Sequence, residues 1–185
     1  MNIFISGGCK NGKSFEAQRI SKRLSELYNS PLYYVATMKS VDSEDDERIQ
    51  RHRIERQGWG FETIEQQNNI AEIACKADLT GVFLVDSVTA LLANEMFGSD
   101  GSVNNEAGET IVEGFDGLLK DIGHTVIVSD YIYSDAEVYD SITEKYRKTL
   151  AWIDIQLAKR CDVVLESAFG FITVHKGEAS YASVV

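Results

Sequence analysis

The chain has 185 residues, 44% of them hydrophobic, which is enough for one domain (residues 1–185) with a buried core. The formal net charge of −11 argues against binding to nucleic acid or to an anionic membrane, because the long-range field repels both. An anionic ligand therefore needs a local pocket of positive groups.

The cysteines and the apolar runs indicate in which cellular compartment the protein is expected. Cys9, Cys75 and Cys161 are odd in number and widely separated, so they predict neither a disulfide framework nor a zinc site. No apolar run reaches the ~18 residues that a membrane span needs, and no leader pattern precedes the first apolar run. We expect a cytoplasmic protein.

The first predicted strand, residues 2–6, is followed by a glycine-rich turn that matches the phosphate-binding loop G-x-x-x-x-G-K-S. The residues of this turn are expected to bind nucleotide: Gly7, Gly8, Cys9, Lys10, Asn11, Gly12, Lys13 and Ser14. Backbone N–H groups would surround phosphate oxygens, an exposed Lys13 would reach the terminal phosphates, and Ser14 would ligate Mg²⁺. A chance glycine-rich turn is the alternative, but the strand before it and the helical pattern after it both fit the loop.

Apolar residues from Ile20 to Tyr28 share one helical face, and residues 32–36 predict the second strand. The stretch 40–59 places acidic residues before arginines, the order that a helix dipole favours, with Ser43 as the expected N-cap.

Within that helix, Arg48, His52 and Arg56 follow one another at intervals of four, so they lie on one face. Two guanidiniums beside an imidazole would suit a triphosphate. The alternative is an ordinary solvated helix face.

The third strand, residues 82–86, ends at Asp86, where a carboxylate could ligate Mg²⁺. The alternative role for Asp86 is the N-cap of the helix predicted at 88–96. A polar, glycine-bearing loop at 98–109 precedes a helical pattern at 111–119.

A fourth strand at 125–129 and a long helix at 142–157 follow, and two apolar runs, 163–167 and 171–175, close the chain. Only three residues separate these last runs, which predicts an antiparallel hairpin at a sheet edge. The alternation of strands and helices predicts an α/β fold of the P-loop NTPase (RecA-like) class, with a mostly parallel sheet flanked by helices.

The motifs together resemble the bifunctional adenosylcobinamide kinase/adenosylcobinamide-phosphate guanylyltransferases of cobalamin biosynthesis. The family's loop G-G-x-x-S-G-K-S matches residues 7–14 except at Asn11, and its Y-I-A-T strand is similar to residues 34–37. Its motif R-I-x-x-H-[RK]-x-x-R matches residues 48–56. The resemblance extends over nearly the whole chain.

The resemblance implies two reactions with nucleotide. ATP or GTP, with Mg²⁺ held by Ser14 and Asp86, would phosphorylate adenosylcobinamide, and His52 would then accept GMP from GTP and pass it to adenosylcobinamide phosphate. Lys13 and Asp86 would also be catalytic, and Arg48, Arg53 and Arg56 would bind the phosphates. A homotrimer is also implied.

Three segments depart from the family pattern, and in the first of them Gln57 follows Arg56 where the family has proline. Residues 129–135 replace N-E-V-G-x-G-I-V-P, and Asp154 stands where the family has asparagine. Two other functions stay open: a small-molecule kinase without a histidine intermediate, and a non-catalytic nucleotide-binding relative.

Overall fold

The computed structural model describes the whole backbone and every side chain except those of Glu44, Arg48 and Glu55. Seven strands form one sheet in the order β3-β2-β4-β5-β1-β6-β7, in which only the β6–β7 pairing is antiparallel. The strands are β1 (Asn2–Gly7), β2 (Leu32–Ala36), β3 (Glu62–Glu65), β4 (Val82–Asp86), β5 (His124–Asp130), β6 (Val163–Ala168) and β7 (Phe171–Lys176).

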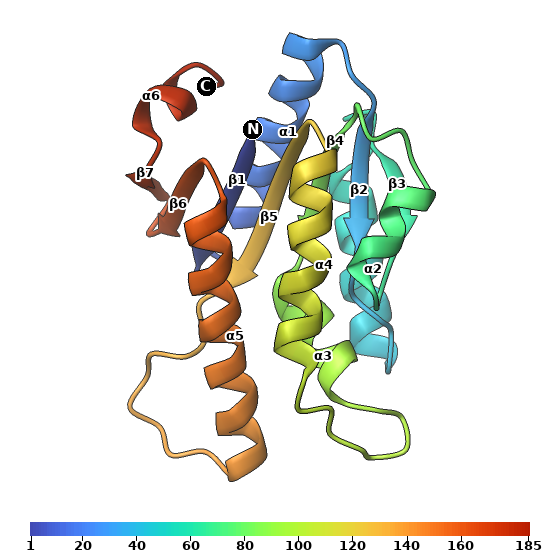
Figure 1. Cartoon of the computed structure of the whole chain (residues 1–185), viewed down its shortest axis with the longest axis vertical. Coiled ribbons are helices and arrows are strands. Elements are labelled where there is room, and N and C mark those ends of the chain that lie inside the picture. The colour runs from blue at the N-terminus through green and yellow to red at the C-terminus, as the bar shows by residue number, and fades with distance from the viewer.

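Helices cover both faces of this sheet (Figure 1): α3, α4 and α5 lie on one face and α1 lies on the other. The helices are α1 (Lys13–Tyr28), α2 (Ser43–Glu55), the 3-10 helix η1 (Ile70–Cys75), α3 (Val88–Met96), α4 (Ala107–Asp121), α5 (Ser141–Arg160) and α6 (Glu178–Ala182). Among the described residues, none of these helices combines the length and apolar character that crossing a bilayer requires.

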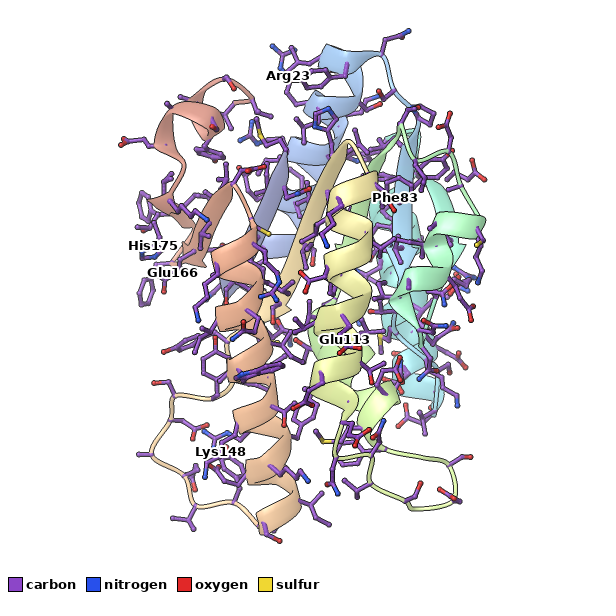
Figure 2. The ribbon with its side chains drawn as sticks, in the orientation of Figure 1. Arg23, Phe83, Glu113, Lys148, Glu166 and His175 are labelled. Atoms are coloured by element: carbon purple, nitrogen blue, oxygen red, sulfur yellow. The ribbon has the colours of Figure 1, made fainter. Side chains whose placement is uncertain are left out.

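The core has two parts, one on each face of the sheet. Phe83 of β4 and Phe115 of α4 are fully buried on the α3–α5 face, and Ile20 and Leu24 of α1 are fully buried on the opposite face. Figure 2 marks Phe83 within the sheet layer. The continuous apolar runs of the central strands are thus explained by burial on both faces.

The predicted class, a mostly parallel P-loop sheet with an antiparallel edge hairpin, is confirmed, and all six predicted strands are present. Three short elements were not predicted: β3, η1 and α6. The loop predicted at 98–109 is too long, because α4 begins at Ala107. Leu27 and Tyr28, predicted on the apolar face of α1, are about half exposed.

The cap of α2 also differs from the expectation. The carboxylate of Asp42 accepts a hydrogen bond from the backbone N–H of Asp45 at 2.9 Å, while Ser43 is the first residue of the helix. Asp42 therefore caps the helix in place of Ser43, one residue earlier than predicted.

Strand order decides which loops meet. β5 lies between β1, which precedes the phosphate loop, and β4, which ends at Asp86. Because β1, β4 and β5 are parallel, Gly7, Asp86 and Asp130 end their strands at the same edge of the sheet.

Asp154 is a buried carboxyl close to the end of β5. Asp154 of α5 is only 3% exposed, and its Oδ2 accepts a hydrogen bond from the Tyr133 hydroxyl at 3.0 Å. Burial raises the pKa of the Asp154 carboxyl to about 7, and the negative charge of Asp130 adds to the rise. The folded protein therefore holds this proton more tightly than the unfolded chain does.

Replacing Asp154 with asparagine should change how stability depends on pH. From its ordinary pKa of 3.8 up to about 7, the unfolded chain loses the Asp154 proton before the folded protein does, so rising pH favours unfolding. The free energy of unfolding of the wild type should fall across this range by as much as about 4 kcal/mol relative to Asp154→Asn, and the difference should level off above it. Urea unfolding of both proteins between pH 4 and pH 8 measures this, and parallel profiles would show that Asp154 has an ordinary pKa.

Candidate active site

The phosphate loop connects β1 to α1, and its backbone needs glycine at two positions. Gly12 has a φ of 84°, a conformation that other residues rarely adopt, and it precedes the first residue of α1. A Cβ on Gly7 would lie 2.3 Å from the carbonyl oxygen of Ser167. The Ser167 hydroxyl donates a hydrogen bond to the carbonyl of Asn11 at 2.7 Å, so β6 supports the loop from below.

Lys13 is the first residue of α1, and its side chain lies inside the loop. It is 5% exposed, so the expectation of an exposed lysine is wrong. Its Nζ donates to the carbonyl oxygen of Gly8 at 2.7 Å and forms an ion pair with Asp130 Oδ1 at 2.9 Å. These two contacts hold the ammonium group of Lys13 at the edge of the sheet where β1, β4 and β5 end.

Asp86, at the end of β4, accepts a hydrogen bond from the Tyr34 hydroxyl at 2.9 Å. Burial raises the pKa of Tyr34 well above its usual value, and the charge of Asp86 adds to the rise, so the phenol remains a donor. The N-cap of α3 is Ser87, whose side chain accepts from the backbone N–H of Ala90. The alternative that Asp86 is the helix cap is therefore wrong.

The turn after β4 is tied to the end of β2. The hydroxyl of Thr37 donates to the carbonyl of Ser87 at 2.8 Å and accepts from the N–H of Ser87 at 2.7 Å. The Asn94 side chain donates to the carbonyls of Thr37 and Gln67, at 2.8 and 3.0 Å. These bonds fix the strand ends on either side of Asp86.

Helix α2 carries His52 and the neighbouring arginines. Arg53 forms an ion pair with Glu65 of β3 at 3.1 Å, and both side chains are about half exposed. Arg56, just beyond the helix, is 8% exposed, and its guanidinium stacks on the ring of Tyr34 at 3.5 Å from the ring centre. The side chain of Arg48, which was expected on the same face, lies outside the described residues.

Two cavities open at this edge of the sheet. The loop cavity, of about 560 Å³, is lined by the phosphate loop from Cys9 to Ser14 and by Arg51 of α2. The second cavity, of about 330 Å³, lies between β2, α2 and α3 and is lined by both Arg53 and Arg56. Four residues line both cavities: His52, Asp86, Ser87 and Asp130. We call these four residues the junction.

The structure therefore brings together the phosphate loop, Asp86 and His52, although more than thirty residues separate each from the next in sequence. Sequence reasoning did not identify Asp130, Arg51 or Tyr34 as candidate site residues. Asp130 could have been found, because it ends an apolar strand as Asp86 does. Arg51 could not have been found in this way, because it immediately precedes His52 and is therefore not on the helix face that carries Arg48, His52 and Arg56.

Two residues of the loop cavity carry side-chain oxygens of the kind that Mg²⁺ prefers. They are Ser14, with a hydroxyl, and Asp86, with a carboxylate. Among the described residues, no group of three or more His, Cys, Asp or Glu side chains is arranged to hold a metal ion. Mg²⁺ in nucleotide sites takes one or two protein ligands and completes its shell with phosphate oxygens and water, and this donor set fits such a site.

Comparisons with known proteins identify the family. Residues 3–174 match the protein family described as "Cobinamide kinase / cobinamide phosphate guanyltransferase". The bifunctional adenosylcobalamin biosynthesis protein CobU of Escherichia coli (strain K12) is 31% identical over 100 residues, which are 52% of this chain and 51% of that protein. The aligned part thus spans about half the length of this curated relative.

Two solved structures are similar in fold only. They are the flagellar accessory protein FlaH from Methanocaldococcus jannaschii, at 16% identity and a TM-score of 0.48, and a KaiC-like protein from Pyrococcus horikoshii OT3, at 15% and 0.49. Each covers 95% of this chain, and the chain covers 77% and 79% of them. Identities this low say nothing about the reaction.

The family match runs from the first strand to the last and includes the phosphate loop, helix α2 and all four junction residues. The chain belongs to the cobinamide kinase / cobinamide phosphate guanyltransferase family.

Proposed function

We propose that this protein phosphorylates adenosylcobinamide with a nucleoside triphosphate and then transfers GMP from GTP to the product, through a GMP-histidine intermediate on His52. The substrates follow from the family to which the chain belongs. The observation that supports the two-step chemistry best is that His52, Asp86 and Asp130 line both the loop cavity and the second cavity.

A junction between two cavities suits transfer at phosphorus, because the reacting phosphorus lies between the group that leaves and the group that accepts. In the kinase step the triphosphate would occupy the loop cavity, and the aminopropanol arm of adenosylcobinamide would enter through the second cavity. In the guanylyl step the pyrophosphate of GTP would occupy the loop cavity and the nucleoside the second. In both steps the reacting phosphorus is then next to the junction.

The kinase step needs the terminal phosphate to be held and its charge to be neutralised. The backbone N–H groups at the start of α1 would bind phosphate oxygens, and Lys13 would move from Asp130 to the phosphates. Ser14 and Asp86 would hold Mg²⁺, which when bound neutralises charge on the phosphate oxygens.

The guanylyl step needs a nucleophile that is also a good leaving group. Neutral His52 would attack the α-phosphorus, a nitrogen–phosphorus bond would form, and the bond to pyrophosphate would break. The GMP would then move from the imidazole to the phosphate of adenosylcobinamide phosphate, which releases His52. The guanidiniums of Arg51 and Arg53 lie on the two cavities that meet at His52 and would stabilise the phosphate charge.

Incubation with α-labelled GTP and Mg²⁺, followed by a denaturing gel, tests this proposal. A guanylyltransferase keeps the label on the denatured chain, whereas a plain kinase or a nucleotide-binding relative loses it. Adenosylcobinamide phosphorylation, followed by mass spectrometry, then separates those two alternatives. The homotrimer implied by the resemblance stays part of the proposal, and light scattering in solution tests it.

Replacing Asp86 with asparagine should weaken Mg²⁺-dependent nucleotide use far more than stability. The amide can still accept the hydrogen bond from Tyr34, but it lacks the negative charge that a divalent cation requires. We expect a loss of turnover of about tenfold or more at low Mg²⁺, measured by titrating Mg²⁺ at saturating ATP.

Tyr34→Phe is the matched control, because it removes the hydrogen bond and leaves the charge of Asp86 in place. Its Mg²⁺ dependence should stay close to that of the wild type. Wild-type Mg²⁺ dependence in Asp86→Asn would remove Asp86 from the metal site.

A further inference from the structure

Asp130 is held firmly at the junction by its own backbone and by that of the next residue. Its N–H donates to the hydroxyl of Thr89 in α3 at 2.9 Å, and the N–H of Tyr131 donates to the carbonyl of Gly7 at 2.8 Å. The end of β5 is thus tied to the phosphate loop on one side and to α3 on the other. The carboxylate is 21% exposed and lines both cavities.

The partner of this carboxylate is also the phosphate ligand of the loop. Asp130 Oδ1 lies 2.9 Å from the Nζ of Lys13. The lysine of this loop motif binds the terminal phosphates of a nucleotide, and a triphosphate carries more negative charge than one carboxylate. Phosphate binding would therefore draw Lys13 away from Asp130 and leave the carboxylate able to accept a proton.

The other titratable side chains of the junction, and Tyr146 beside it, have other partners or proposed roles. Asp86 accepts from Tyr34 and is the proposed Mg²⁺ ligand. His52 is the proposed nucleophile of the other step. Tyr146 donates its hydroxyl to the carbonyl of Thr89 at 2.8 Å, and burial, with the charge of Asp130, raises its pKa, so it stays protonated. Asp130 is the remaining carboxylate at the junction.

We propose that Asp130 is the general base of the phosphoryl transfer, released for this role when Lys13 engages the phosphates. The inference rests on the proposed kinase function and adds a residue role to it. Asp130 takes the proton of the acceptor hydroxyl, whose oxygen forms a bond to the γ-phosphorus. The bond from that phosphorus to the β–γ bridging oxygen breaks, and the nucleoside diphosphate leaves with the electron pair. The proton then passes from Asp130 to solvent.

The kinetics of Asp130→Asn with ATP, Mg²⁺ and adenosylcobinamide test the inference. We expect kcat to fall by about 100-fold or more, the range for loss of a general base. The KM for ATP should stay the same or fall, because Lys13 no longer pairs with a carboxylate. Glu113→Gln is the matched control, because Glu113 is an exposed residue of α4 (Figure 2) that lines neither cavity, and it should behave as the wild type.

Chemical rescue distinguishes a base from a structural role. In Asp130→Ala, added formate should restore part of the lost kcat, and it should not accelerate the wild type. A near-normal kcat in Asp130→Asn, with only a lower KM for ATP, would mean that Asp130 merely restrains Lys13, and the inference would be overturned. Loss of activity without any formate rescue would overturn it too.

The wild-type reaction separates this inference from the proposed function. If the wild type phosphorylates adenosylcobinamide and Asp130→Asn does so at a similar kcat, only the role of Asp130 fails. If the wild type shows no phosphorylation while it binds a fluorescent ATP analogue, the kinase proposal fails and the base role fails with it.

Discussion

Replacing Lys13 with alanine is expected to abolish phosphoryl transfer, with a loss in kcat of at least about 100-fold, as for removal of one preorganised electrostatic donor. Lys13 is the cation that the loop folds around, with its Nζ 2.7 Å from the Gly8 carbonyl oxygen and 2.9 Å from Asp130. In the proposed site, Lys13 would be the positive charge next to the terminal phosphates, and the alanine variant would lack it. Mass spectrometry of phosphorylated adenosylcobinamide measures the effect.

The same substitution should also cost stability, because the ammonium group is buried. Removal leaves Asp130 unpaired at 21% exposure, so the expected cost lies between that of an exposed pair, up to about 1 kcal/mol, and that of a buried pair, about 3–5 kcal/mol. Lys13→Met, which keeps the apolar stem, separates folding from catalysis. Lys148→Ala on α5 (Figure 2) is the control, since Lys148 is 76% exposed. Near-normal turnover in a folded Lys13→Met protein would contradict the phosphate-loop role.

Replacing His52 with asparagine is expected to remove the GMP adduct completely while phosphorylation of adenosylcobinamide continues. The protein mixed with GTP and Mg²⁺ should gain the mass of one GMP, and peptide mapping should find it on His52. Asparagine has no nucleophilic nitrogen to replace the imidazole. Asp86, Ser14 and Lys13, which the proposed kinase step would use, are unchanged.

The chemistry of the adduct gives a second measurement. A phosphoramidate is labile in acid and stable in base, because protonation of its nitrogen makes imidazole a good leaving group, whereas an ester on Ser14 or Tyr34 is not acid-labile in this way. His175→Asn is the matched control: His175 lies on β7, 2.8 Å from Glu166 at the edge of the sheet (Figure 2), and should not affect the adduct. An adduct on another residue, or none at saturating GTP, would favour the plain kinase.

The central strands and the phosphate loop could be predicted because their signals are local. Residues 32–36 and 82–86 are strands with the predicted bounds, since continuous apolar runs are buried on both faces of a parallel sheet. The four residues of β3 have only one buried side chain, Ile64, and therefore gave no apolar pattern. The short α6 buries none of its own residues, so its sequence carries no helical periodicity.

The candidate site was predicted less completely than the fold. The spacing of His52 and Arg56 predicted a common face, and both residues line the second cavity. The spacing did not predict that Arg56 stacks on Tyr34, because Tyr34 belongs to strand β2. Asp86 and Ser87 are equally good helix caps by residue type, and only the backbone path after β4 decided that Ser87 caps α3. Lys13 was expected to be exposed because the phosphate-loop motif does not include its ion-pair partner. That partner is Asp130, at the end of the neighbouring strand β5.

The sequence by itself determined the phosphate loop, the succession of strands and helices, and the position of His52 on a charged helix, because each depends on residues close together in the chain. Only the tertiary structure decided that β5 lies between β1 and β4, and that α2 brings His52 to the same two cavities as Asp86 and Asp130. The physical reason is that strand order and helix docking depend on pairing and burial between segments that are distant in sequence. The periodicity within one segment carries no information about these contacts. The junction therefore has no pattern of its own in the sequence, although each of its residues is visible there.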